Sequence, residues 1–79
     1  MYFVYVLKSK IRNYNYIGLT NNLNRRVSQH QHGQAKTTNP YKPFELIHVE
    51  EFLTRVEARN REKYFKSGMG REYIKNIIK

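Results

Sequence analysis

The sequence predicts a small α+β fold, in which a three-stranded antiparallel sheet is flanked by about three helices in one domain over residues 1–79. Residues 2–7 and 14–19 have the composition of strands and are separated by a polar turn, which is typical of a hairpin. Residues 44–52 form a third strand-like run, and the stretch that follows has helical spacing. The chain has 79 residues, which is enough for one small core and not for two.

The two hairpin strands differ in their patterns. Residues 2–7 are apolar on both faces, which favours a place in the middle of the sheet. The second strand carries Tyr14, Tyr16 and Gly18 on one face. Gly18 removes a side chain near the strand end, so we expect backbone or ligand to come close there.

The first helix is expected over residues 22–32. Thr20, Asn21 and Asn22 can each cap its first turn, and Gly33 would end it. Its core contacts would be Leu23 and Val27. The prolines of residues 34–43 predict a loop, which offers Lys36 and Lys42 to a phosphate backbone.

The third strand is expected to alternate regularly, with Phe44, Leu46 and His48 on one face. Thr54 and Glu57 have the spacing of a capping box and open a second helix, which should end at Gly68. A short third helix from about Gly70 would bury four apolar side chains: Tyr73, Ile74, Ile77 and Ile78.

The charge of the chain points to an anionic partner. Fifteen Lys and Arg against six acidic residues give a formal net charge of +9 and a pI near 10.0. Nucleic acid is favoured, since seven Tyr and four Phe can stack on unpaired bases. An acidic membrane surface fits less well, because no apolar run approaches the roughly 20 residues of a spanning helix. Without cysteine or a basic leader, we expect a cytoplasmic protein.

Arg26 and His30 lie four residues apart, so they share one helix face, beside Leu23 and Val27. An arginine fork binds phosphate through two hydrogen bonds, and histidine moves protons near neutral pH. The pair therefore suits phosphoryl chemistry, although an exposed Arg and His on a basic helix would give the same pattern. Arg25 points elsewhere and is expected to be either solvated or in contact with the DNA backbone.

Glu62 is an anomaly in the second helix. It falls inside an apolar stripe formed by Ala58, Phe65 and Met69, where a carboxylate costs several kcal/mol unless a cation pairs with it. Two explanations are open at this point. One is a structural ion pair with an arginine, and the other is a ligand for Mg²⁺, which prefers carboxylate oxygens together with waters and phosphate.

Five residues in order, Tyr5 within Val4-Tyr5-Val6, Tyr16 within Tyr16-Ile17-Gly18, then Arg26, His30 and Glu62, resemble the GIY-YIG endonuclease family. The pattern is similar to the catalytic domain of the bacterial excinuclease C subunit and of phage homing endonucleases. It looks closest to small free-standing bacterial members, which carry segments like Arg61-Glu62-Lys63 and Gly70-Arg71-Glu72. Val4 and Val6 depart from the glycine and tyrosine of the first motif.

The resemblance implies hydrolysis of a phosphodiester with one Mg²⁺ or Mn²⁺. By position, Glu62 would hold the metal and Arg26 would bind the scissile phosphate. Tyr5 would orient or deprotonate the attacking water, with Tyr16 nearby and His30 assisting proton movement. A tyrosine is a poor base at pH 7, so this role requires cations or metal to lower its pKa. The family's later asparagine near the metal has only a loose counterpart in Asn76.

The expected function is therefore a metal-dependent DNA endonuclease, structure-directed or weakly sequence-specific, in DNA repair or processing. The alternative is a nucleic-acid-binding module without turnover that docks onto a repair complex. RNA as the substrate, a protein partner that supplies specificity, and the oligomeric state stay open. Four cations are expected to contact the nucleic acid: Arg25, Lys36, Lys42 and Arg71.

Overall fold

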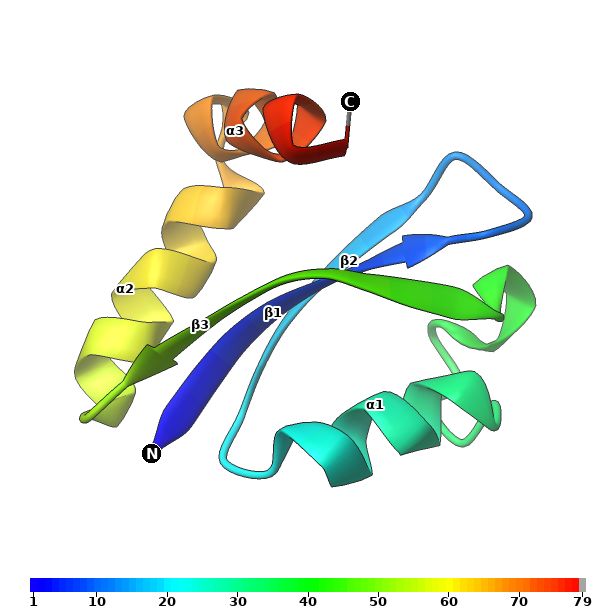
Figure 1. The fold of residues 1–79 in the computed structure, drawn as a ribbon, viewed down its shortest axis with the longest axis horizontal. Coiled ribbons are helices and arrows are strands. Elements are labelled where there is room, and N and C mark those ends of the chain that lie inside the picture. Colours follow the sequence, from blue (N-terminus) through cyan, green and yellow to red (C-terminus); the bar gives the residue numbers. More distant parts are fainter. Residues whose placement is uncertain (79) are drawn as a thin grey trace.

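A computed structural model describes residues 1–78, which form a three-stranded sheet with helices on both faces (Figure 1). The strands are β1 (Tyr2–Ser9), β2 (Asn15–Thr20) and β3 (Phe44–Phe52), all antiparallel and in the order β2-β1-β3. The prediction of an α+β fold with a central first strand is confirmed. In this place β1 is hydrogen-bonded on both sides and covered on both faces, which explains its continuous apolar run.

Within residues 1–78, three helices and one short 3-10 turn complete the fold. Helix α1 (Leu23–Gln31) begins at Asn22, whose side chain accepts a hydrogen bond from the Arg25 N–H at 3.2 Å. Gly33 adopts φ +74°, the left-handed conformation that ends a helix at low cost. The 3-10 turn η1 (Asn39–Tyr41) lies within the predicted loop.

Helix α2 (Arg55–Lys66) begins at Thr54, which accepts from the Glu57 N–H at 3.2 Å, as its capping-box spacing predicts. Helix α3 (Gly68–Ile78) begins earlier than expected. Gly68 does not end α2, because Ser67 adopts an extended backbone (ψ 172°) and its Oγ accepts from the Gly70 N–H at 3.3 Å. Ser67 therefore ends α2 and caps α3.

The sheet divides the core into two clusters. On one face Val4, Val6 and residues of α2 and α3 pack together: Ala58, Phe65 and Ile74. On the other face Tyr5 and Leu7 pack with Phe44 and with Leu23 and Val27 of α1. Leu23 and Val27 thus make the expected core contacts.

The third strand contains a β-bulge, so its side chains do not face the sides of the sheet that were predicted. Val6 pairs with His48 but the next residue, Leu7, pairs with Leu46, so Ile47 is the extra residue. Facing side chains share a side of the sheet, so Leu46 lies with Leu7 and His48 lies with Val6. The regular alternation that put Leu46 and His48 on one face was wrong, because the bulge shifts the register within the strand.

Met69 and Tyr73 were expected to be buried but are exposed, because the chain changes direction between α2 and α3. Met69 is 73% exposed and does not extend the apolar stripe of α2, because that helix ends before it. Tyr73 is 37% exposed, whereas Ile74 is buried and Ile77 and Ile78 are half-buried. No helix within residues 1–78 is long and apolar enough to cross a membrane.

Candidate active site

Tyr5 lies at the centre of the α1 face, fully buried, and its ring crosses the neighbouring strand at Gly18. A Cβ added at Gly18 would collide with the Tyr5 hydroxyl and ring. The close approach predicted at Gly18 is therefore made by the side chain of Tyr5. This path carries the hydroxyl of Tyr5 past β1 to the edge strand β2.

The Tyr5 hydroxyl ends a chain of buried polar groups. It lies 3.2 Å from His30 Nε2, and His30 Nδ1 lies 2.8 Å from Thr38 Oγ1. Thr38 Oγ1 in turn donates to the Ala35 carbonyl at 3.3 Å. Because the Thr38 proton is used there, His30 Nδ1 donates to Thr38 and His30 Nε2 accepts from Tyr5. The exposed His30 of the alternative interpretation is excluded, since its side chain is fully buried.

The two ends of the Tyr5–His30 pair have opposite pKa shifts. Burial, and then the charge of Arg26, lower the pKa of His30 from its ordinary value of 6.5, so the ring is neutral at pH 7. Burial, Tyr16 and Glu62 raise the pKa of Tyr5 to about 12, although Arg26 acts in the lowering direction. The protein's own cations therefore do not produce the lowered pKa expected for a tyrosine base.

Arg26 lies beside this pair on α1, half-buried, with one guanidinium nitrogen bonded to Gln29 Oε1 at 2.9 Å. That bond holds the guanidinium along the helix, a hydrogen bond from Arg26 acts on Tyr5, and the remaining donors are left for a ligand. Arg25 was expected to point elsewhere; it is exposed, yet both arginines line one cleft of about 140 Å³ beside Thr20. Two guanidinium groups at one small cleft suit an anionic group such as phosphate.

Tyr16 is half-buried and shares the face of Tyr5. Its ring centroid lies 6.2 Å from that of Tyr5 and 4.6 Å from that of His30. The aromatic ring therefore covers the Tyr5–His30 pair from the side of β2 and limits the access of bulk water to it.

Glu62 comes from α2, and its charge reaches Tyr5, whose pKa it raises. Its side chain is 18% exposed, between buried Ala58 and Phe65, so the apolar seam is present. Its ion pair within residues 1–78 is with Lys66 at 3.4 Å, rather than with an arginine. A carboxylate held at this exposure by one long contact keeps oxygen lone pairs for another ligand.

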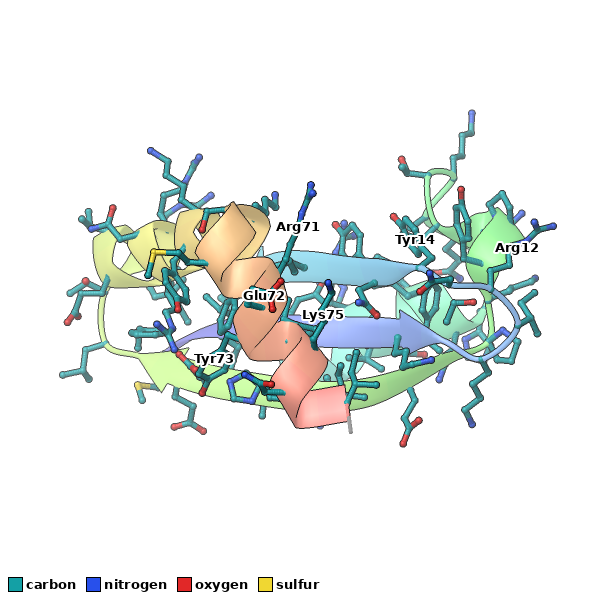
Figure 2. All side chains as sticks on the ribbon, turned by 90° about the horizontal axis from the view of Figure 1, so that it is seen from above. Arg12, Tyr14, Arg71, Glu72, Tyr73 and Lys75 are labelled. Carbon is teal, nitrogen blue, oxygen red and sulfur yellow. The ribbon has the colours of Figure 1, made fainter. Side chains whose placement is uncertain are left out.

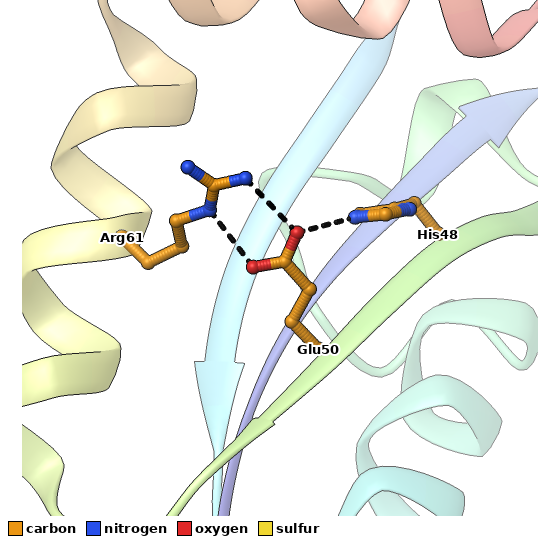
Figure 3. A network of polar contacts seen from close by, with 3 residues as sticks. All are labelled: His48, Glu50 and Arg61. Atoms are coloured by element: carbon orange, nitrogen blue, oxygen red, sulfur yellow. Dashed lines mark hydrogen bonds and ion pairs between the residues drawn. The ribbon is translucent and has the colours of Figure 1, made fainter.

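Sequence reasoning missed a polar network that joins β3 to α2 (Figure 3). Arg61 donates to both oxygens of Glu50, at 2.8 and 3.1 Å, and His48 Nε2 lies 2.7 Å from Glu50 Oε2. Burial alone would raise the pKa of Glu50, but the bonds from Arg61 and His48 outweigh it and lower the pKa. The i, i+2 spacing of His48 and Glu50 was the available signal that they share a face, but the regular alternation assumed for the strand placed them on the side of the sheet away from α2.

Arg61 is also enclosed by aromatic rings. Its guanidinium carbon lies 4.7, 4.6 and 5.4 Å from the ring centroids of Tyr64, Phe65 and Tyr73. These cation–π contacts and the bidentate ion pair connect three elements, β3, α2 and α3. Because Glu62 follows Arg61 directly, the network also fixes the rotation of α2 that places Glu62.

The donor set fits a hard divalent cation bound through one carboxylate. Within residues 1–78 no group of three or more His, Cys, Asp or Glu side chains could hold a metal ion. Mg²⁺ commonly keeps several waters and takes only one or two carboxylates with substrate phosphates, which a single accessible Glu62 can satisfy. Asn76 is exposed on α3.

The other expected nucleic-acid contacts lie on separate elements. Lys36 and Lys42 are exposed in the segment between α1 and β3, and Arg71 is exposed on α3. The structure therefore brings Tyr5, Tyr16, Arg26 and His30 together and sets Glu62 within electrostatic reach. The exposed cations are distributed around that group rather than within it.

Comparisons with known proteins identify the family of the chain. Residues 1–74 match the family described as the GIY-YIG catalytic domain. The chain is 46% identical over 66 residues to the UPF0213 protein YazA of Bacillus subtilis (strain 168), covering 82% of this chain and 66% of YazA. It is 42% identical over 67 residues to the UPF0213 protein CPE1444 of Clostridium perfringens (strain 13 / Type A), covering 84% of this chain and 71% of that protein.

A solved structure has the same fold. The solution NMR structure of the UPF0213 protein BH0048 from Bacillus halodurans superposes with a TM-score of 0.58 at 31% identity, covering 98% of this chain and 85% of that one. The chain spans about two thirds of the length of YazA. From the match over residues 1–74 and these relatives, the chain belongs to the GIY-YIG catalytic domain family, together with the UPF0213 proteins.

Proposed function

We propose that the protein is a divalent-metal-dependent endonuclease that hydrolyses DNA phosphodiester bonds. The buried chain Tyr5–His30–Thr38, next to the Arg26 guanidinium, carries this proposal. A core that only needed to be stable has no need to bury a tyrosine hydroxyl and a histidine beside an arginine, because each buried polar group costs free energy until it is paired. A site that must remove a proton next to a phosphate needs both groups.

Tyr5 and His30 act together as the base. A hydroxyl with a pKa near 12 is a poor phenolate at pH 7, so it relays a proton rather than storing one. As Tyr5 Oη takes the proton of the attacking water, its own proton moves to His30 Nε2. Nδ1 of the same ring stays bonded to Thr38, which keeps the imidazolium in place.

Arg26 holds the scissile phosphate. Its free guanidinium donors face a small cleft shared with Arg25, where two phosphate oxygens can be bound. Negative charge grows on these oxygens during attack, so their hydrogen bonds strengthen in the transition state. Arg25, being more exposed, contributes affinity for the backbone rather than stabilisation of the reaction.

Glu62 would hold the metal ion, which when bound supplies positive charge at the phosphate and the leaving oxygen. Lys66 pairs with Glu62 Oε2 and would be displaced where the ion takes that oxygen. This displacement is easy, because the Lys66 side chain is 56% exposed and its contact is long. We further propose that the enzyme serves DNA repair or processing and selects DNA by structure more than by sequence.

Cleavage of end-labelled linear, nicked, flapped and four-way-junction DNAs in Mg²⁺ and in Mn²⁺ tests the proposal. Wild type should give metal-dependent product, whereas Glu62→Gln and Arg26→Ala should bind DNA without cutting it. Lys63→Ala, the loss of an exposed neighbour of Glu62, is the matched control and should cut normally. Product that survives both site substitutions would rule the proposed site out. Salt-sensitive binding with no product from any protein would instead favour a binding module that lacks turnover.

A further inference from the structure

A groove of about 560 Å³ runs along the edge strand β2, between it and helices α2 and α3. Its lining includes Tyr14, just before β2, Tyr16 within β2, and Lys66, Arg71 and Lys75 from the two helices. This volume lies within the range of roughly 300–1,000 Å³ of pockets that hold small organic ligands. It is far too small for a double helix, so an occupant of nucleic-acid chemistry must be a part of one strand.

The groove leads directly to the proposed active site. Two of its lining residues contact groups of that site: the Tyr16 ring lies 4.6 Å from the His30 ring, and Lys66 Nζ lies 3.4 Å from Glu62. The groove and the proposed site therefore adjoin each other at Tyr16 and at the contact of Lys66 with Glu62.

An aromatic column ends at the groove. The Tyr14 ring is stacked on the Tyr41 ring with centroids 3.9 Å apart and planes 12° apart. The Arg12 guanidinium lies 6.0 Å from the Tyr41 centroid, on the same column. Tyr41 covers one face of Tyr14 and holds the ring in place, and Tyr14 also lines the groove, so the part of its ring that lines the groove is preorganised to stack on one more planar group.

Cations and amides surround this end of the column. Figure 2 looks onto this side of the molecule, where α3 carries Arg71 and Lys75 across the sheet and Tyr14 lies toward the hairpin turn. Arg71 has no carboxylate partner within residues 1–78. Lys75 has only a long, exposed contact with Glu72, at 3.5 Å. Asn13 and Asn15 line the same groove and offer donors and acceptors suited to a base edge.

We propose that this groove binds an unpaired nucleotide next to the scissile phosphate, with its base stacked on Tyr14 and its phosphate held by Arg71 and Lys75. The inference rests on the proposed nuclease function and specifies its substrate: DNA in which the strand to be cut is unpaired on one side of the cut. Aromatic stacking accepts any base, so the groove reads the absence of pairing and not the sequence.

Binding measured without cleavage tests the groove. Fluorescence anisotropy in EDTA compares a blunt labelled duplex with the same duplex carrying a four-nucleotide single-stranded extension. Wild type should bind the extended duplex roughly tenfold more tightly. Tyr14→Ala and Arg71→Ala should lose most of this preference, while Tyr14→Phe, which keeps the ring, should retain it. Arg59→Ala removes one exposed arginine of α2 outside the groove and should leave the ratio unchanged.

Three results would overturn the inference. One is equal binding of the two duplexes by wild type, and another is a preference that survives Tyr14→Ala in a protein with a normal melting temperature. The third is displacement of the DNA by polyglutamate that is equally strong for wild type and Tyr14→Ala, which would favour an acidic protein partner. Parallel cleavage assays separate the two proposals. A Tyr14-dependent binding preference without cleavage would support the groove as a nucleotide-binding site and would contradict the proposed nuclease function.

Discussion

Tyr5 and Gly18 depend on each other. The tyrosine ring can cross the sheet edge only because its neighbour on β2 has no side chain. The same crossing brings the hydroxyl to His30 Nε2, so one missing methyl group allows the whole polar chain to form. The second motif requires glycine at this place for packing, independently of any ligand.

Gly18→Ala should therefore destabilise the protein. The added Cβ meets the Tyr5 ring, and overpacking of this kind costs about 1–3 kcal/mol. Urea denaturation gives the free energy of unfolding. Gly68→Ala is the matched control, since a Cβ at Gly68 has no atom within 4 Å, and it should be neutral or slightly stabilising. Equal stability of the two variants would contradict the packing argument.

Tyr5→Phe removes one oxygen from the proposed relay. The ring remains over Gly18, but His30 Nε2 loses its donor and the attacking water loses its proton acceptor. We expect the cleavage rate to fall by about 10²–10⁴-fold, the usual contribution of acid–base catalysis. Tyr2→Phe makes the same change on a half-buried tyrosine outside the site and should leave the rate intact. A Tyr5→Phe rate within twofold of wild type would remove Tyr5 from the chemistry.

The neutral state of His30 makes stability depend on pH. The pKa of His30 is lowered in the folded protein from its ordinary value of 6.5, so the unfolded chain binds a proton more readily. The stabilising contribution is present above about pH 6.5 and is lost as the pH falls below it. Chemical denaturation of wild type from pH 8 to pH 5 should therefore show declining stability, with a shallower decline for His30→Gln. A decline of equal slope in both proteins would mean that His30 is not the group responsible.

A contact with β3 fixes the rotation of helix α2 on the sheet. Arg61 binds Glu50 through two hydrogen bonds, and the neighbouring residue of the helix is Glu62. The bulge at Ile47 decides this, since it turns His48 and Glu50 toward the helix. One irregular position in a strand therefore positions a carboxylate on another element.

Glu50→Gln should show what this contact contributes. The pair is about three-quarters buried at Glu50, and we expect a loss of about 1–3 kcal/mol in the free energy of unfolding. Glu72→Gln is the control, because Glu72 and Lys75 form an exposed pair of the kind that contributes little. Cleavage should fall together with stability. Arg61→Lys should lower both as well, since lysine lacks the planar fork of arginine. If Glu50→Gln had the stability of wild type, the ion pair would not stabilise the position of α2, and apolar packing would account for it.

The carboxylate of Glu50 also makes stability depend on pH in acidic solution. Its pKa is lowered by Arg61 and His48 despite burial, so its contribution is present above the ordinary value of 4.5 and is lost as the pH falls below it. This window lies lower than that of His30, so the two effects can be separated along one pH series.

Across the whole molecule, charge is distributed unevenly. Three of the six acidic residues lie on β3, namely Glu45, Glu50 and Glu51, away from the groove along β2 on the other edge of the sheet. The remaining surface carries the excess of cations. Electrostatic attraction should therefore orient an approaching nucleic acid toward α1, β2 and α3.

DNA affinity should accordingly depend steeply on salt. If Arg25, Lys36, Lys42 and Arg71 each neutralise one phosphate, the logarithm of the binding constant for a duplex with a single-stranded extension should fall against the logarithm of salt with a slope of roughly −4. Anisotropy titrations from 50 to 300 mM salt measure the slope. Each single alanine substitution should reduce it by about one, and a wild-type slope near zero would exclude the phosphate contacts altogether.

The sequence by itself determined the strands, the cap at Thr54, and the three candidate caps Thr20, Asn21 and Asn22, of which Asn22 is used, because periodicity and capping are local properties of a chain. The same is true of the pairing of Arg26 with His30 on one helix face. Only the tertiary structure decided that His30 is buried and neutral, that the pKa of Tyr5 rises, and that Glu50 holds Arg61. These properties depend on desolvation and on contacts between residues far apart in the chain, and no local pattern encodes the bulge that creates one of them.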